Sequence, residues 1–163
     1  IPATWDSSIL TESYKDANEH RMLLDLARND VSKFADIGSL NVSKVMQIEE
    51  FTSVKHLVSQ VRARFSNTSH LDILKAMFPA GTVSGSPKER AIEIIDRYED
   101  SARGPYGGAI GITMESAMDL ALTIRSAYSD GSGFRLRAGA GIVKDSDPDA
   151  EVREIYSKAR AVI

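Results

Sequence analysis

Two pairs of carboxylates have the spacing that metal chemistry requires. Asp16 and Glu19 are three positions apart, and so are Glu151 and Glu154. In a helix this spacing places both members of a pair on one face, and carboxylate oxygens are the ligands that Mg²⁺ prefers. Alternatively, acidic residues near helix starts simply complement the helix dipole. The spacing alone leaves both interpretations open.

Other residues could handle protons or anions. His56 could be a general base, because an imidazole titrates near neutrality, or a structural strand histidine. Arg125 could hold a carboxylate with its planar guanidinium, or be an ordinary solvated strand residue. Residues 81–88 combine glycines, hydroxyls and a lysine and could bind an anion through backbone N–H groups. They lack Walker A spacing, and residues 138–141 lack the third glycine of the dinucleotide fingerprint.

The composition is typical of a globular protein that does not bind nucleic acid or membranes. The chain has 163 residues, 42% hydrophobic and 26% charged, which predicts a single globular domain over residues 1–163. Its net charge of -3 is spread over interleaved acidic and basic residues, so no nucleic-acid or membrane partner is expected. No apolar run approaches the roughly 20 residues of a membrane span, and we expect a cytoplasmic protein. The absence of cysteine excludes disulfides and thiol nucleophiles.

Four helices are predicted to carry part of this chemistry. Their ranges are about 11–34, 69–78, 86–98 and 147 to the end, with a loop over 79–85. The sequence Ser86-Pro87-Lys88-Glu89 has the form of a capping box with proline at the first helical position. In the last helix, one side is apolar and the other is predicted to carry Glu151, Glu154 and Lys158.

Five strands are predicted from alternating and β-branched residues, over 40–48, 54–65, 106–114, 118–129 and 134–143. His56 should face away from Leu57. The last three strands should form an antiparallel meander, with Arg125 on a polar strand face and Gly139 and Gly141 on one face of the final strand. Grouped helices and strands predict an α+β fold, with helices packed on one face of an antiparallel or mixed sheet.

Several motifs together resemble the chorismate-utilising enzymes, and within them the anthranilate synthase component I family. They are EHRMLLDLARND at 19–30, HLVS at 56–59, GTVSGSPK at 81–88 and YGGA at 106–109, followed in the family's order by RSA at 125–127, AGAGIV at 138–143 and KARA at 158–161. The resemblance covers nearly the whole chain from about Asp16 onward. It implies the carboxy-terminal part of a longer chain and the chorismate-binding αββα fold.

The resemblance also assigns roles to the candidate residues. It implies that Glu19 and Glu154 hold Mg²⁺ on the ring carboxylate of chorismate, with Asp16 and Glu151 as neighbours. It implies that His56 is the general base for aromatisation, while Thr82 hydrogen-bonds the substrate near the ring carboxylate or the departing hydroxyl. The groups expected to receive or attract the enolpyruvyl carboxylate are Tyr106, Arg125, the backbone at Gly139 and Gly141, and Lys158.

The implied reaction converts chorismate and ammonia to anthranilate and pyruvate in tryptophan biosynthesis. Because no cysteine can form a glutamyl thioester, ammonia must come from solution or from a partner amidotransferase, component II, in a hetero-oligomer. The enzymatic alternatives are aminodeoxychorismate synthase component I and isochorismate or salicylate synthase. The pair Glu19-His20 and the loops at Thr82 and Tyr106 favour the anthranilate reaction. A non-catalytic fragment that binds chorismate or docks the amidotransferase is an alternative of another class.

Overall fold

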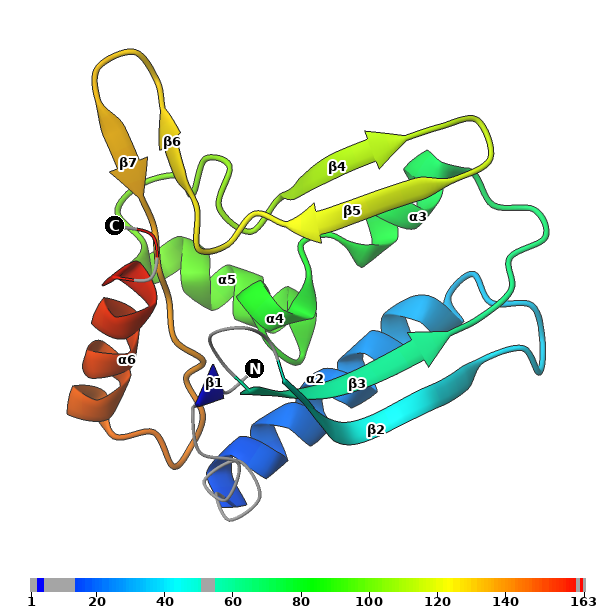
Figure 1. Ribbon diagram of the computed structural model, residues 1–163, viewed down its shortest axis with the longest axis horizontal. Helices are drawn as coiled ribbons and strands as arrows, with labels where there is room; N and C mark the ends of the chain where they lie inside the picture. Colours follow the sequence, from blue (N-terminus) through cyan, green and yellow to red (C-terminus); the bar gives the residue numbers. More distant parts are fainter. Residues whose placement is uncertain (1–2, 5–13, 51–54, 161, 163) are drawn as a thin grey trace. The chain divides into compact units, whose positions relative to one another are not determined.

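The computed structural model describes residues 3–4, 14–50, 55–160 and 162, with only the backbone described at residues 3–4 and 14–16. The contacts divide the chain into two compact units, Ile1–Met77 and Phe78–Ile163. Figure 1 labels the elements of both. The single domain expected over residues 1–163 stays a prediction.

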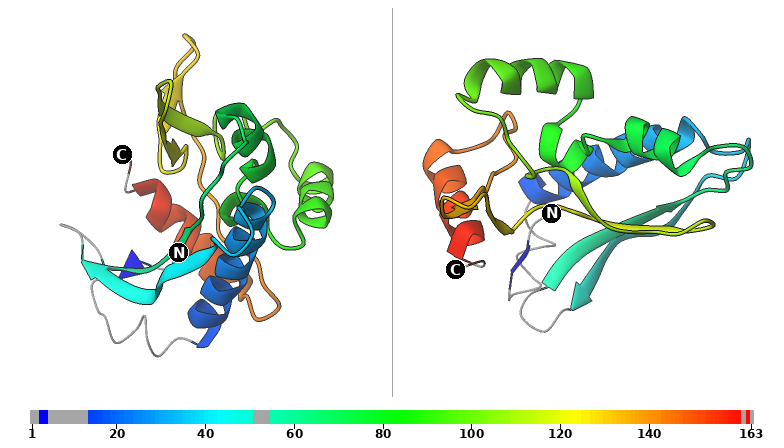
Figure 2. Two further views of the ribbon diagram at one scale, coloured as in Figure 1. Left: turned by 90° about the vertical axis from the view of Figure 1, so that its right-hand side faces the viewer. Right: turned by 90° about the horizontal axis from the view of Figure 1, so that it is seen from above.

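The first unit is a three-stranded antiparallel sheet covered by helices (Figure 1). Its strands are β1 (Ala3–Thr4), β2 (Asn41–Glu50) and β3 (Lys55–Arg62), in the order β1-β3-β2. Helix α2 (Tyr14–Ser32) packs against β3, and α3 (His70–Met77) contacts α2 (Figure 2). The strands predicted over 40–48 and 54–65 and the helix predicted over 69–78 are confirmed. The described part of the helix predicted over 11–34 is confirmed as well.

The apolar core of the described residues lies in this unit. Leu57 of β3 is 2% exposed, and Leu26 and Val31 of α2 are buried with it. Strand side chains alternate between faces. Because Leu57 is buried and Ser59 bonds to α2, the odd-numbered residues of β3 face the helix.

A β-bulge interrupts the pairing of β2 with β3. The register shifts between Val42 and Lys44 and again between Lys44 and Gln47, and Met46 has φ +49°. The Met46 N–H donates to Ser59 Oγ over 2.9 Å, which replaces a lost ladder bond. Ser59 Oγ also lies 2.7 Å from Nε2 of His20, a residue of α2 that is 4% exposed. One hydroxyl therefore fixes both the bulge and the helix.

The second unit contains three helices and two separate hairpins (Figure 1). The helices are α4 (Gly81–Ser84), α5 (Lys88–Tyr98) and α6 (Pro148–Arg160). The hairpins are β4 (Ala109–Thr113) with β5 (Met118–Leu122), and β6 (Ala127–Ser129) with β7 (Phe134–Leu136), both antiparallel. The α+β class is confirmed, and every pairing of described strands is antiparallel.

The predicted meander is wrong because the strand expected over 118–129 breaks at Arg125. Arg125 has φ +49°, outside the β region, and the Ile124 N–H donates to the carbonyl of Leu122 over 2.9 Å. Arg125 therefore lies in a bend between two hairpins instead of on a strand face. The third strand is also shorter than predicted. It ends at Leu136, so Gly139 and Gly141 lie in the irregular segment that follows.

The region predicted as a loop over 79–85 contains the single helical turn α4. The Val83 N–H and the Ser84 hydroxyl both donate to the carbonyl of Ala80, over 3.0 and 2.9 Å. The predicted capping box is wrong. Helix α5 begins later than expected, with Pro87 itself in the cap position and no side-chain cap bond.

Helix α6 begins at Pro148 as predicted, with Asp147 accepting the N–H of Ala150 over 2.8 Å. The sequence divides this helix into an apolar and a polar side, and the buried side does not follow that division. Glu151 is 4% exposed, whereas Val152 and Tyr156 are 49% and 65% exposed. Glu154 is also exposed, and Ile155, Lys158 and Ala159 are half-buried, so the inward side of α6 mixes polar and apolar residues. No helix of the described residues is long and apolar enough to cross a membrane.

Leu57→Ala should destabilise the protein by about 2–5 kcal/mol, because it leaves a cavity beneath α2. The matched control is Val45→Ala on β2, whose side chain is 54% exposed and should cost within about 0.5 kcal/mol. Urea unfolding followed by circular dichroism measures both. Equal midpoints for the two variants would show that the α2–β3 contact does not stabilise the unit.

Candidate functional site

The hydroxyl of Tyr106 approaches the backbone of Gly139 so closely that it would have to move to admit a side chain there. A Cβ placed on Gly139 would lie 2.9 Å from that oxygen, closer than real Cβ atoms come. Tyr106 lies in the loop before β4 and is half-buried. Burial raises the pKa of its hydroxyl, which therefore stays protonated at neutral pH and can donate a hydrogen bond.

Lys158 of α6 reaches the same glycine. Its Nζ donates to the carbonyl of Gly139 over 3.1 Å and lies 2.5 Å from Oε1 of Glu154. Lys158 thus reaches the segment that Tyr106 contacts, and Glu154 is linked to that segment through its ion pair with Lys158. A protonated hydroxyl and an ammonium on one glycine can together bind an anionic oxygen.

Arg125 and Gly141, the two other positions predicted to bind the enolpyruvyl carboxylate, have no described contact with Tyr106, Lys158 or Gly139, and the same holds for Thr82. Arg125 lies in the bend after β5 with its side chain exposed, and among the described residues its guanidinium has no hydrogen bond or ion pair. Gly141 is exposed and lies two residues beyond Gly139. Thr82 is exposed on α4.

Three of the predicted residues, Asp16, Glu19 and His56, belong to the first unit. Glu19 is half-buried on α2. His56 is half-buried on β3, opposite Glu49 in the register, and faces away from Leu57 as predicted. The side chain of Asp16 lies outside the described residues. Beside Glu19, burial lowers the pKa of His20 and favours its neutral form.

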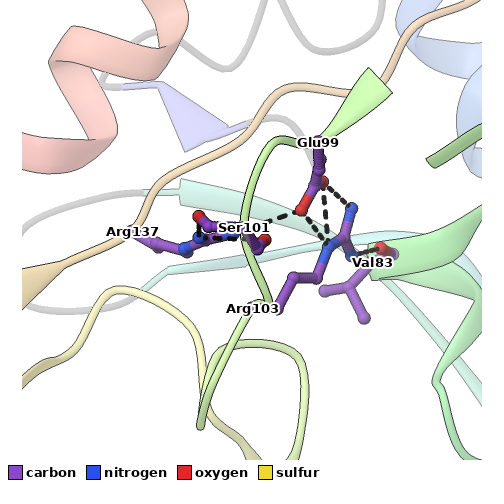
Figure 3. Close-up of polar contacts among 5 residues, drawn as sticks. All are labelled: Val83, Glu99, Ser101, Arg103 and Arg137. Carbon is purple, nitrogen blue, oxygen red and sulfur yellow. Dashed lines mark hydrogen bonds and ion pairs between the residues drawn. The ribbon is translucent and has the colours of Figure 1, made fainter. Parts of the chain in front are cut away.

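Sequence reasoning missed a polar network around Glu99, at the end of α5 (Figure 3). The Glu99 carboxylate accepts from Nε of Arg103 over 2.9 Å and from Nη1 of Arg137 over 3.1 Å. The hydrogen bond from Arg103 is the main cause that lowers the pKa of Glu99. Its stabilising effect is therefore present at neutral pH and is lost only as the pH falls through the lowered pKa. The signal that could have indicated this network in the sequence is the spacing of Glu99 and Arg103, which are four residues apart and can form an ion pair.

The donor groups are compatible with Mg²⁺. Glu19, Glu151 and Glu154 offer carboxylate oxygens, the hard ligands that this ion prefers. Among the described residues no group of three or more acidic, histidine or cysteine side chains could hold a metal ion. Mg²⁺ is commonly held by one or two carboxylates, with water and substrate oxygens as the other ligands. A site using Glu19 or Glu154 in that way fits the residues present.

Comparison with known proteins places these residues in a family. Residues 5–163 match the family described as chorismate binding enzyme. The chain is 47% identical over 156 residues to anthranilate synthase component 1 of Neisseria meningitidis serogroup B, covering 94% of this chain and 32% of that one. It therefore spans about a third of the length of that relative.

Solved structures agree in fold. Anthranilate synthase component I from Streptococcus pneumoniae superimposes with a TM-score of 0.82 and 40% identity, covering 96% of this chain and 36% of that one. The menaquinone-specific isochorismate synthase from Escherichia coli gives a TM-score of 0.83 at 27% identity, covering 95% and 36%. The fold is thus shared across the two reactions, whereas the sequence is closer to the first.

Gly139→Ala should destabilise the protein by about 1–3 kcal/mol, because the new Cβ forces the Tyr106 hydroxyl to move. Tyr106→Phe removes that hydroxyl, and the next ring atom would lie at 3.9 Å, an ordinary contact. Alanine at position 139 should therefore cost much less in the Tyr106→Phe background. Thermal unfolding of both single variants and the double variant measures the difference. An equal cost in both backgrounds would contradict the contact.

Proposed function

Since this chain belongs to the family of chorismate binding enzymes, we propose that it is the chorismate-binding part of an anthranilate synthase component 1. The observation that carries the proposal is the meeting of Tyr106, Lys158 and Glu154 around Gly139. These are groups expected to receive a substrate carboxylate and a metal ion. The identity of 47% with a relative of that name, against 27% with an isochorismate synthase, favours the anthranilate reaction.

In the proposed site the enolpyruvyl carboxylate accepts hydrogen bonds from the Tyr106 hydroxyl and from backbone N–H groups at Gly139 and Gly141. Lys158 supplies a positive charge nearby, and its bond to the Gly139 carbonyl orients it. Arg125 completes the binding of this carboxylate. Its exposed guanidinium leaves the fork available for a bidentate contact.

The chemical steps use groups of the chain that ordinarily exchange protons. Ammonia adds at ring carbon two of chorismate, the hydroxyl at carbon four leaves, and loss of pyruvate restores the aromatic ring. His56 accepts the proton that the ring loses, since an imidazole titrates near neutrality. Thr82, exposed on α4, donates a hydrogen bond near the ring carboxylate or the departing hydroxyl.

Glu19 and Glu154 are proposed to hold Mg²⁺, with Asp16 and Glu151 beside them. The ion supplies Lewis acidity to the ring carboxylate when it is bound. Ammonia is proposed to come from a glutamine amidotransferase subunit, component II, in a hetero-oligomer, because the chain has no cysteine for a glutamyl thioester. The cytoplasmic location expected from the sequence stays a prediction.

The purified chain should form fluorescent anthranilate from chorismate, Mg²⁺ and an ammonium salt at mildly alkaline pH. A chelator should abolish the signal, and chelator already saturated with Mg²⁺ is the control. Chromatography of the products tests the alternatives. Aminodeoxychorismate, isochorismate or salicylate would assign another reaction, and bound but unconverted chorismate would assign a binding fragment.

Lys158→Met should change the affinities for the two ligands in opposite directions. Chorismate affinity should fall about tenfold, as expected when a hydrogen bond to a charged group is lost. Mg²⁺ affinity should rise, because the ammonium that pairs with Glu154 no longer opposes the cation. Calorimetry measures both, and the exposed Lys144→Met is the control. A fall in both affinities would instead indicate local unfolding of α6.

A further inference from the structure

The Glu99 carboxylate is a shared acceptor for two guanidiniums that come from different segments. Arg103 lies in the loop after α5 and Arg137 directly follows β7. Arg103 binds through two nitrogens, with Nη2 2.5 Å from Oε1 in addition to the Nε contact, and Arg137 binds the other oxygen (Figure 3). A carboxylate has the lone pairs to accept all of these bonds at once.

The Arg103 side of this network reaches two proposed substrate-binding residues. Its Nη1 donates to the carbonyl of Val83 over 2.5 Å, and Val83 follows Thr82 in the single turn of α4. Its guanidinium carbon also lies 5.7 Å from the centre of the Tyr106 ring, within the range of a cation–π contact. Arg103 thus contacts the ring of Tyr106 and the turn that bears Thr82.

The Arg137 side of the network reaches the segment that carries Gly139, a third proposed substrate-binding position. Its Nη2 donates to the hydroxyl of Ser101 over 2.5 Å and contacts the carbonyl of the same residue at 3.3 Å. Arg137 precedes Gly139 by two residues, so these bonds fix the start of the segment that carries Gly139 past Tyr106. Without a common anion, the two arginines would no longer be tied to each other.

We propose that Glu99 is a positioning residue, which holds Thr82, Tyr106 and Gly139 in the mutual arrangement that binds and orients the substrate. The role rests on the proposed function. Side chains of Glu99, Arg103 and Arg137 are 33%, 26% and 29% exposed. At such exposure an ion pair contributes modestly to stability. Its main effect is therefore on geometry, to which reaction rates are far more sensitive.

The test compares Glu99→Gln with Glu93→Gln in the whole 163-residue chain. Glu93 lies on the same helix and pairs with Arg90 at 2.6 Å, and its side chain is 57% exposed. Anthranilate formation from chorismate and ammonium gives kcat and KM, and calorimetry gives the number of chorismate sites per chain. Glu99→Gln should raise KM and lower kcat/KM on the order of 10- to 100-fold, with the number of sites unchanged. Glu93→Gln should match the unsubstituted chain.

Two results would overturn the role of Glu99. One is a kcat/KM for Glu99→Gln within about twofold of the unsubstituted value. The other is a loss confined to fewer binding sites at unchanged KM, which would indicate a purely structural role. If Glu99→Gln does not fold, Arg137→Lys replaces it, because it keeps the charge but loses the fork that joins Glu99 to Ser101. A raised KM supports positioning, and an unchanged KM excludes it.

The two proposals fail in different ways. An unsubstituted chain that neither binds chorismate nor forms anthranilate contradicts the proposed function. An unsubstituted chain that turns over chorismate, with Glu99→Gln equal to it, contradicts only the positioning role.

Discussion

The ion pairs of Glu99 are the interaction on which the second unit depends. In the described residues of that unit no apolar side chain is fully buried, whereas the first unit buries Leu26, Val31 and Leu57. Apolar burial is therefore less extensive in this unit than in the first. Glu99 instead joins the end of α5 to the Arg103 loop and to the segment after β7. Polar contacts of this kind are directional, so they set geometry even where they add little stability.

The first unit is organised in a different way. Packing of α2 on β3 supplies its stability, and the single hydroxyl of Ser59 links that helix to the bulge at Met46. Glu19 is next to His20 on the helix, and His56 is on the strand that α2 covers. An apolar layer thus supports Glu19 and His56, while a charged network supports the substrate-binding candidates of the second unit.

The sequence predicted the elements of the first unit better than those of the second. Periodicity identified α2, α3 and the two long strands because their apolar positions repeat regularly along the sequence. It failed at Arg125, where one residue in the left-handed region turns the chain, and over 137–143, where side-chain contacts replace a strand ladder. It located α6 but did not identify the burial of Glu151, because a buried carboxylate is invisible to a hydrophobic pattern. Motifs identified Tyr106, Gly139, Lys158 and Glu154 as candidates, but only geometry could bring them together or reveal Glu99.

Strand β4 exposes two isoleucines and an unpaired edge, which favour self-association. Ile110 and Ile112 are 68% and 67% exposed, and β5 is the only strand that pairs with β4 among the described residues. A bare edge with isoleucines on it is a template for any extended chain that it meets. The rate at which two copies pair through this edge rises with the square of the protein concentration. The time that the protein stays monomeric in solution therefore falls as its concentration rises. Asp119 lies opposite Ile112 in the hairpin, and its negative charge opposes pairing of this kind between two copies.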